Sequence, residues 1–323
     1  MKNQPLVSII SVNYNQSGLT CQMIDSIKQC AYRNIEIIIV DNASPSDEPD
    51  KIKEANPDIH LIKCEQNLGF AGGNNEGVKE AKGKYIFFLN NDTEVDPGFL
   101  EPLVEAFENN ANLGMASPKI IYHGTDNIIQ YAGEGGINPL TGRGKKSGRG
   151  EKDMGQFDTS TETALGHGAA MMVPLKVIEE VGLMPDIFFL YYEEHDWCEM
   201  IKRAGYKVMY VANATIYHKE SMSVGKNSPL KSYYMARNRL IFMRRNSKGL
   251  VRLLSILFFI FLTIPKNTLK HLIKFEFKLL QTFLKGVFWN IGHDNVKQNP
   301  RLIKNTLNGF DITGAYQHRL QKI

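Results

Sequence analysis

Hydrophobic residues in the first 120 positions form short continuous runs, separated by stretches long enough for a helix. Four runs rich in β-branched and aromatic residues predict strands at 6–12, 35–40, 59–63 and 85–89, and a helical pattern covers about 19–30. Continuous apolar strands at such intervals are typical of a parallel sheet with helices on both faces. We therefore predict an α/β fold with a mostly parallel central sheet.

The predicted strands end in polar side chains. In open α/β sheets, ligands bind at the carboxyl ends of the strands. The residues found there are Asn13, Asn15, Asp41, Asn42, Asn67, Asn90, Asn91 and Asp92. Together they point to one binding edge.

Asp92 follows the apolar run of FFLNNDTEVDPGFL directly. Mg²⁺ and Mn²⁺ prefer oxygen ligands, and they usually take one or two carboxylates plus water and substrate phosphates. A carboxylate at a strand end would supply such a ligand. The same residues also suit a turn or a helix cap, so spacing alone leaves both interpretations open.

Asp41 could accept a hydrogen bond from a nucleotide base or a ribose hydroxyl, or it could cap a turn. The segment NLGFAGGNN, from Asn67 through Gly73 and Asn74, combines glycines that allow close backbone approach with amides that donate and accept hydrogen bonds. Its glycines do not match GxGxxG, which argues against a dinucleotide-binding fold.

A second polar cluster, Glu193-Glu194-His195-Asp196, follows the aromatic run FFLYY. Crowded carboxylates beside aromatic rings can raise the pKa of one acid and suit it to general base catalysis. The alternative is an acidic first turn of a helix. His218 ends another predicted strand, 214–218, where a lone histidine is more often structural.

The middle of the chain departs from the alternating pattern. Residues 113–140 predict strands and turns, 163–173 a strand, and a helix starts near 174. The segment 142–150, GRGKKSGRG, predicts a mobile loop and lacks the GxxxxGK[ST] phosphate-loop pattern.

The C-terminal part is basic and amphipathic. From Arg244 onward there are 14 Lys/Arg against 3 Asp/Glu, although the whole chain carries only +4. The apolar run 253–264 has 12 residues, fewer than the roughly 20 that span a bilayer. Lys266, Lys270, Lys274 and Lys278 then recur on one helical face, which predicts an amphipathic helix lying in a membrane interface. The alternative is a helix packed on the protein's own core.

Composition sets further bounds. Of 323 residues, 43% are hydrophobic and 22% charged, which is typical of a globular protein. This length allows one large domain plus an appendage, or two modest domains. Four separated cysteines predict reduced, structural thiols in a cytosolic protein. The short N-terminal apolar run is expected to be a strand, not a signal peptide.

These motifs occur together in one order: NYN, VDNAS, NLGFAGGNNEG, FFLNNDTEVDP, GAAMMV, FFLYYEEHDWCEMIKRAGY and IYHKESMS. This order resembles family 2 glycosyltransferases of GT-A fold, rhamnosyltransferase-like branch, over about residues 6–240. The resemblance implies a glycosyltransferase domain at 1–240 and a basic, membrane-associating helical region at 241–323.

The resemblance also implies roles. Glu194 would be the catalytic base, with Glu193 and Asp196 shaping its field or binding acceptor hydroxyls. Asp92 and His218 would hold a divalent metal, Mg or Mn. The first position of the family's DxD motif is Asn90 here, which removes one negative charge. The implied nucleotide-sugar-binding residues are Asn13, Asn15, Asp41, Asn67, Gly73, Asn74, Asn90 and Asn91. Residues 142–150 could fold over the donor phosphates, and the role of Arg237-Asn238 stays open.

The implied activity is inverting transfer of a sugar from dTDP-rhamnose or a UDP-sugar to a polysaccharide or lipid-linked saccharide hydroxyl, in cell wall polysaccharide biosynthesis. We expect a cytoplasmic protein bound peripherally to the inner face of the cell membrane, with no nucleic acid partner. Two alternatives remain: a sugar nucleotidyltransferase, and a basic membrane-surface or nucleic-acid binding protein without catalysis.

Overall fold

The computed structural model describes residues 4–220, 228–293, 303–304 and 310–311. Its core is a ten-stranded mixed sheet. The N-terminal half is parallel, with β1 (Val7–Asn13) between β4 (Tyr85–Leu89) and β2 (Ile35–Asp41), and β3 (His60–Lys63) at the edge. The predicted parallel arrangement is confirmed here, and the strand predicted at 85–89 matches β4 residue for residue.

The other half of the sheet contains the reversed strands. The strand order across this half of the sheet is β4, β11, β6, β12, β10; β5 pairs with β12, and β7 pairs with β6. The bounds are β5 (Thr93–Val95), β6 (Leu113–Tyr122), β7 (Ile129–Tyr131), β10 (Thr161–Glu162), β11 (Ala170–Pro174) and β12 (Lys207–His218). Because β11 runs antiparallel to β4 and β6, the sheet is mostly but not wholly parallel.

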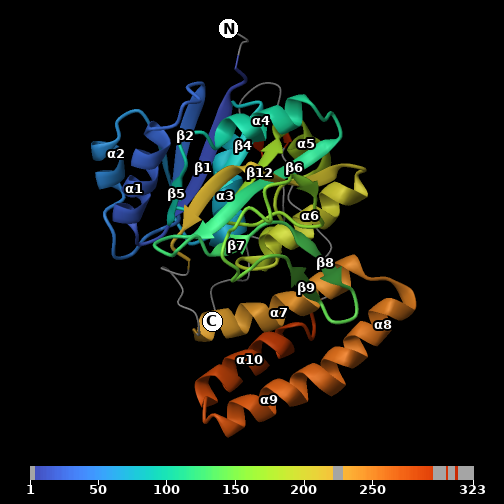
Figure 1. Ribbon diagram of the computed structural model, residues 1–323. Helices are drawn as coiled ribbons and strands as arrows, with labels where there is room; N and C mark the ends of the chain where they lie inside the picture. Colours follow the sequence, from blue (N-terminus) through green and yellow to red (C-terminus); the bar gives the residue numbers. More distant parts are fainter. Residues whose placement is uncertain (1–3, 221–227, 294–302, 305–309, 312–323) are drawn as a thin grey trace.

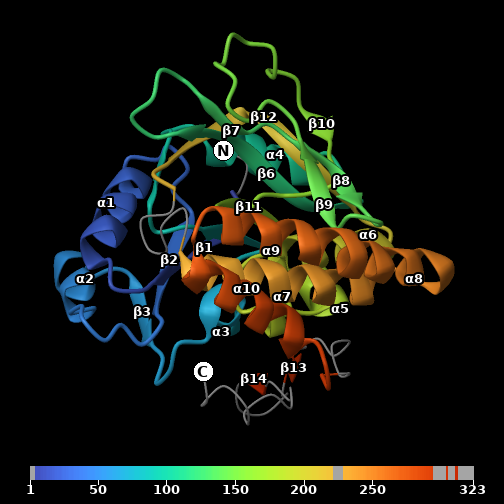
Figure 2. The same ribbon diagram turned by 90° about the horizontal axis from the view of Figure 1, so that it is seen from below.

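Helices cover both faces of the sheet because alternate strand residues point to opposite sides. Phe87 belongs to the hydrophobic cluster between the sheet and the first helix group, and Phe88 to the hydrophobic cluster between the sheet and the second. The first group is α1 (Ser17–Lys28), α2 (Asp50–Ala55) and α4 (Leu100–Glu108). The second is α3 (Gly69–Glu80), α5 (Leu175–Val181) and α6 (Glu193–Arg203), with the 3₁₀ turn η1 (Asp186–Phe188) before α6. Figure 2 shows the two layers from below.

The segment 142–150 is not simply a loop. Its first half forms β9 (Arg143–Lys146), which pairs antiparallel with β8 (Glu134–Asn138) in a separate hairpin. The expectation of a mobile loop is therefore corrected for these residues, since β-ladder hydrogen bonds fix their backbone.

Four helices follow the sheet domain. α7 (Pro229–Asn246) packs under the carboxyl ends of the strands, and the chain then forms a helical arm, residues 249–289, that projects away from the sheet. The arm comprises α8 (Gly249–Phe258), a π-helical turn η2 (Phe259–Thr263), α9 (Ile264–Ile273) and α10 (Phe277–Trp289). The predicted domain boundary at residue 240 falls inside α7.

Two expectations for the arm are corrected. The apolar run of 12 residues is part of one continuous helix, Gly249–Ile273, which has 25 residues and is long and apolar enough to cross a membrane. The predicted single amphipathic helix is instead broken at Phe275, whose φ of 54° is left-handed. His271 Nδ1 lies 2.8 Å from Glu276 Oε2 across this turn. Most of the predicted region beyond residue 293 lies outside the described residues, apart from the short β13 (Ile303–Lys304) and β14 (Phe310–Asp311).

Candidate functional site

A cleft of about 870 Å³ opens at the carboxyl ends of β1, β2, β4 and β12, and α7 and the helical arm form its other wall. Seven of the predicted site residues line this cleft: Asn67, Asn90, Asn91, Asp92, Glu193, Glu194 and His218. Residues that are far apart in the sequence of the sheet domain therefore line the same cleft. The last residues of the IYHKESMS motif, 221–223, lie outside the described residues.

Asp92 and His218 face each other in the cleft, with Asp92 Oδ1 3.0 Å from His218 Nε2. Asp92 lies in the turn between β4 and β5, and His218 is the last residue of β12. Because β5 pairs antiparallel with β12, Thr93 lies opposite His218 and brings its neighbour Asp92 to the same place. Both side chains are buried.

Gln130, on β7, determines which nitrogen of His218 faces the cleft. Gln130 Oε1 lies 2.8 Å from His218 Nδ1, so Nδ1 donates its hydrogen to Gln130. In the neutral ring, Nε2 then carries a lone pair, and the amide of Asn90 lies 3.4 Å from it. Sequence reasoning missed Gln130, because nothing distinguishes it from any polar residue in a strand.

This arrangement fits a divalent cation. When His218 is neutral, the lone pair on Nε2 and the oxygen of Asp92 are both acceptors, and a positive charge, either a proton on Nε2 or a bound cation, is needed to hold them 3.0 Å apart. Divalent cations in such sites take few protein ligands and complete their shell with water and phosphate oxygens. No cluster of three or more His, Cys, Asp or Glu suited to a metal occurs in the described part of the chain. Asp92 and His218 would thus be the side-chain ligands, and the remainder would come from a diphosphate and water.

Glu193 and Glu194 both line the cleft, and each has a buried Oε2 with no hydrogen-bond partner among the described residues. Oε1 of Glu194 is 3.6 Å from His195 Nδ1. Gly168 leaves room beside it, since a Cβ there would lie 3.6 Å from the Glu194 carboxyl group. A buried carboxylate oxygen without a partner is rare, and here it points to an absent ligand that carries a proton.

Glu193, the neighbouring acid, differs in protonation. It is buried, and its pKa is raised well above the usual range, first by burial and then by the charge of Glu194. Burial thus favours the protonated form of Glu193, which leaves Glu194, the acid implied as the base by the resemblance, as the candidate to accept a proton.

The backbone before Glu193 is strained and is held in place by α7. Phe189, Tyr191 and Tyr192 have φ values of 63°, 70° and 77°, in the left-handed region. The Asn238 amide nitrogen lies within 2.7–2.8 Å of the carbonyl oxygens of residues 188, 190 and 191. Its neighbour Arg237 donates to Asn238 Oδ1 at 2.9 Å and to the Ile187 carbonyl. The Arg237-Asn238 pair thus clamps the loop that aims Glu194.

Asp196 does not line the cleft. It is fully buried; Oδ2 accepts from Arg245 at 2.9 and 2.7 Å, and Oδ1 accepts from Asn246 at 2.6 Å. These partners belong to the C-terminal end of α7. The expectation that Asp196 shapes the field of Glu194 or binds acceptor hydroxyls is therefore replaced by an anchoring role, because its oxygens are already occupied.

Five predicted nucleotide-sugar residues are absent from the cleft lining: Asn13, Asn15, Asp41, Gly73 and Asn74. Asn13 Nδ2 donates to Asp41 Oδ1 at 2.9 Å, and Ser44 Oγ donates to the same oxygen at 2.6 Å. A Cβ on Gly73 would come within 3.0–3.1 Å of the Val12 methyl groups, so glycine here lets α3 approach β1. These residues brace the loops whose neighbours Tyr14 and Asn42 do line the cleft.

Two further cleft residues escaped the sequence analysis. His167 has its ring 6.4 Å from that of His218, and its Nδ1 accepts from the Ala169 N–H at 3.1 Å. Tyr192 donates its hydroxyl hydrogen to the Gly142 carbonyl at 2.9 Å. The only signal in the sequence was proximity to a quoted motif, His167 before GAAMMV and Tyr192 before the acid pair.

Comparison with known proteins identifies the family and the fold. The profile described as glycosyl transferase family 2 matches residues 8–182. The chain is 26% identical over 250 residues to the low-salt glycan biosynthesis hexosyltransferase Agl10 of Haloferax volcanii, covering 73% of this chain and 74% of that protein. It is also 26% identical to the dTDP-rhamnosyl transferase RfbF of Shigella flexneri, covering 74% and 79%. A match to the uncharacterized protein y4gI of Sinorhizobium fredii, 26% identical, spans 77% of this chain but only 28% of that longer protein.

Solved structures share the fold at low identity. The mannosyltransferase PcManGT of Pyrobaculum calidifontis, in complex with GDP-Man and Mn²⁺, aligns with a TM-score of 0.54 at 15% identity, over 91% of this chain and 78% of that one. S. aureus TarS 1–349 aligns with a TM-score of 0.50 at 11% identity, over 89% and 73%. The expected mixed α/β sheet with flanking helices is thereby confirmed.

Proposed function

Because the chain belongs to glycosyltransferase family 2, we propose that the cleft binds a nucleotide-diphosphate sugar beside Asp92 and that Glu194 deprotonates the acceptor hydroxyl. The chain is a nucleotide-sugar glycosyltransferase by family, and the proposal concerns its residues, donor and acceptor. One observation carries it. The unpartnered oxygen of Glu194 lies in the same cleft as the Asp92–His218 pair.

The donor is proposed to bind along the strand ends. The amides of Asn67, Asn90 and Asn91 line the cleft and can donate to ribose and phosphate oxygens. Asp92 and His218 would hold Mg²⁺ or Mn²⁺, which when bound would offset the negative charge that the leaving diphosphate gains. Gln130 keeps the His218 ring in the orientation this requires.

The transfer itself is proposed to be a single displacement. Glu194 Oε2 takes the acceptor hydroxyl proton while that oxygen bonds to the anomeric carbon. The bond from this carbon to the diphosphate oxygen breaks, and the oxygen keeps the electron pair. Attack on the face opposite the leaving group inverts the configuration. Burial favours the protonated form of Glu193, which makes it the less suited of the two acids to accept this proton.

The donor and acceptor are proposed more narrowly from the resemblance and from one relative. The Shigella flexneri relative is named a dTDP-rhamnosyl transferase, so dTDP-rhamnose is the first donor to test, followed by UDP-sugars. The acceptor is proposed to be a growing polysaccharide or a lipid-linked saccharide. Family membership favours this enzyme over both alternatives considered from the sequence.

The test is a panel of dTDP-, UDP- and GDP-sugars, each with and without Mn²⁺. We expect one of them to raise the melting temperature only with the metal, and to release its nucleoside diphosphate slowly in water. Asp92→Ala should abolish the metal-linked shift. The proposal fails if no nucleotide sugar stabilises the protein, or if Asp92→Ala binds the donor with unchanged metal dependence.

The helical arm is proposed to hold the enzyme at the inner face of the cell membrane. Large apolar side chains are exposed along it, among them Phe261, Leu269, Ile273, Phe275 and Phe277. Phe259 is buried against α7, so the long helix lies along the protein with one face packed. Exposed Lys266, Lys270 and Lys274 add positive charge, which favours an anionic surface.

Vesicle binding tests the membrane proposal. The protein should sediment with phosphatidylglycerol vesicles, and Phe261→Ser with Phe275→Ser should reduce the bound fraction without changing donor binding. Equal sedimentation of this variant would contradict the proposal.

A further inference from the structure

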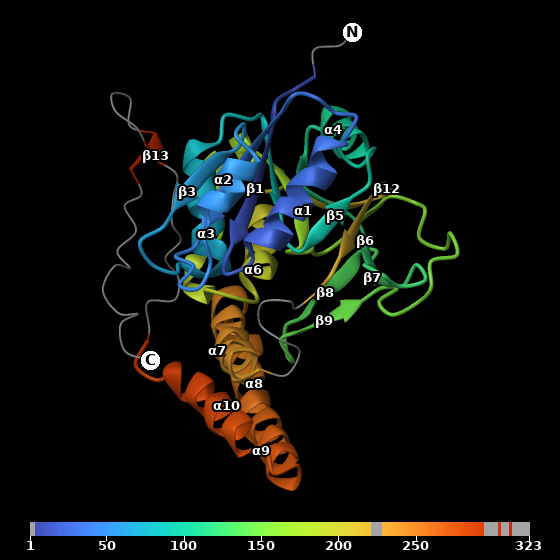
Figure 3. The ribbon, with the colours of Figure 1, turned by 90° about the vertical axis from the view of Figure 1, so that its left-hand side faces the viewer.

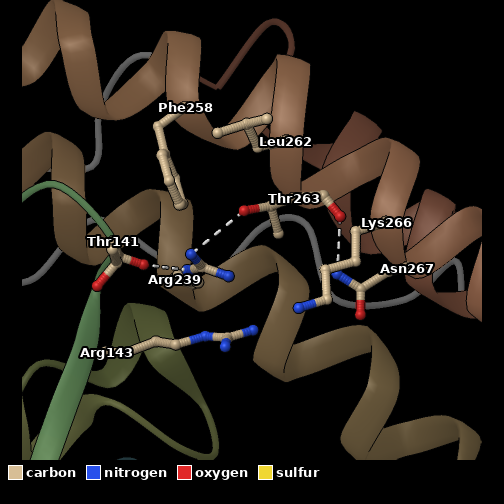
Figure 4. A pocket seen from close by; sticks show the side chains of 8 residues that line it. All are labelled: Thr141, Arg143, Arg239, Phe258, Leu262, Thr263, Lys266 and Asn267. Carbon is tan, nitrogen blue, oxygen red and sulfur yellow. Dashed lines mark hydrogen bonds between the residues drawn. The ribbon is translucent and has the colours of Figure 1, made fainter.

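A small cationic pocket lies where the β8–β9 hairpin meets α7 and the helical arm. Its volume is about 140 Å³, and Figure 4 shows its side chains from close by. Three of them are cations, Arg143 from β9, Arg239 from α7 and Lys266 from α9, and their charged groups face one space. Phe258 and Leu262 form an apolar wall. The pocket thus combines positive charge with hydrocarbon.

Arg239 is built into this pocket. It is only 7% exposed, its Nε donates to the Thr141 carbonyl at 2.7 Å, and its Nη2 donates to Thr263 Oγ1 at 3.3 Å. These bonds leave Nη1 without a partner among the described residues. The pKa of Arg239 is lowered to about 10, mainly by burial and with a smaller contribution from the charge of Arg143.

Among the described residues, no Asp or Glu forms an ion pair with Arg143, Arg239 or Lys266. Arg239 is the buried one of the three, and most buried cations in proteins are paired. Arg245, on the same helix, shows the ordinary arrangement, since it is paired with buried Asp196. Three cations around one pocket without a counter-charge indicate a site for an anion, and guanidinium groups suit the oxygens of phosphate.

The pocket is continuous with the cleft, since it shares Arg143, Arg239, Thr263 and Asn267 with the cleft lining. None of the residues proposed to hold the donor or the metal lines the pocket itself. Tyr192 connects the β8–β9 hairpin to the helix that carries Glu194, because its hydroxyl donates to the Gly142 carbonyl at 2.9 Å and its ring packs 5.6 Å from that of His195.

We propose that Arg143, Arg239 and Lys266 bind the phosphate that links an acceptor saccharide to its lipid. The inference rests on the proposed function, because it assigns the acceptor of that reaction. The donor diphosphate is proposed to bind beside Asp92, which does not line this pocket, so an anion here belongs to the other substrate. The apolar wall at Phe258 and Leu262 continues into the exposed apolar side chains of the arm, where the lipid chain would lie.

The test compares two vesicles of equal charge. One contains phosphatidylcholine with a long-chain polyisoprenyl phosphate, and the other contains phosphatidylcholine with phosphatidylglycerol giving the same surface charge. The measured quantity is the ratio of the two partition coefficients. We expect the full-length protein to prefer the polyisoprenyl phosphate by roughly tenfold, the effect of one charge-assisted hydrogen bond.

Lys266 and Lys270 form a matched pair for this test. Both are exposed lysines of α9, one turn apart, but only Lys266 lines the pocket. Lys266→Gln and Arg143→Gln should bring the ratio close to one, whereas Lys270→Gln should keep it. A ratio of one in the unmodified protein, or an equal loss in Lys270→Gln, would overturn the proposal.

Two further arms identify the source of the phosphate and separate the two proposals. Inorganic pyrophosphate at equal concentration should not displace the protein from polyisoprenyl phosphate vesicles; if it does, the pocket binds a free anion. Metal-linked donor stabilisation should be unchanged in Lys266→Gln and Arg143→Gln. If the vesicle ratio stays at one while donor stabilisation is normal, the pocket assignment is wrong and the proposed function stands.

Discussion

His218 Nε2 lies 3.0 Å from Asp92 Oδ1, although the two residues are 126 positions apart in the chain. The contact depends on the short β5 strand, which pairs with the end of β12 and places Thr93 opposite His218. Neither residue alone is more than a polar strand end. Because the two side chains are in contact, they are the two for which we propose metal binding.

Glu194→Gln should abolish transfer while keeping donor affinity. The substitution removes the basic oxygen but preserves shape, so we expect kcat to fall by roughly 10²–10⁴-fold. Glu193→Gln is the matched control, because burial already favours the protonated, uncharged form of Glu193. This variant should keep most of the activity. Steady-state kinetics with donor titration measures both. Normal turnover by Glu194→Gln would disprove its assignment as the base.

Gln130→Leu should weaken metal binding without touching either ligand. Losing the acceptor for Nδ1 lets His218 change tautomer and rotate, and removal of such a partner costs about 10–100-fold in metal affinity. Mn²⁺ titration with a nucleoside diphosphate present measures this. Gln29→Leu, at the exposed end of α1, should have no effect; if both variants bind Mn²⁺ like the unmodified protein, Gln130 does not orient the ligand.

Glu193 should make stability depend on pH. Its folded pKa lies well above the ordinary 4.5, so its contribution is fully present below that value and declines as pH rises through the folded pKa. The decline is at most about 1.4 kcal/mol per pH unit. Glu193→Gln cannot ionise, so its melting temperature relative to the unmodified protein should increase as the pH rises above 4.5 toward the folded pKa of Glu193.

Thermal unfolding at several pH values checks the Glu193 prediction. Glu54→Gln, on the exposed surface of α2, serves as the control and should shift little across this range. A parallel pH trend in the two variants would mean that Glu193 titrates as an ordinary surface acid.

Asn238→Ala should release the strained turn before α6. The side chain meets three carbonyl oxygens, and leaving buried acceptors unpaired costs about 1–3 kcal/mol each. We expect lower unfolding free energy and a kcat that falls while donor affinity is kept, because only Glu194 is displaced. If kcat at a temperature well below unfolding is unchanged, Asn238 stabilises the fold without positioning the base.

Much of the fold follows from local pattern. The parallel strands, the helix after each, and the polar residues at their carboxyl ends could be predicted because side-chain periodicity and turn chemistry act over a few residues. Asp92, His218 and the polar run 193–196 were identified as candidates in this way, whereas the choice of Glu194 within that run came from the family resemblance. A common edge for Asp92 and the other strand-end residues was expected because parallel strands end at one edge of the sheet.

The remaining features depend on contacts between distant segments. In the run Glu193-Glu194-His195-Asp196, α6 places Glu194 in the cleft and points Asp196 toward Arg245 of α7. Burial favours the protonated form of Glu193. All three residues are acids within one run of four, so no local sequence signal assigns them different roles.

By itself, the sequence determined the strands, the helices and the set of polar residues from which a site could be made, because those depend on neighbours in the chain. The tertiary structure decided which acid is paired with Arg245 and which histidine nitrogen faces Asp92. It also brought Arg143, Arg239 and Lys266 to one pocket. The physical reason is that charge, burial and hydrogen bonding act through space, between segments that the chain order keeps far apart.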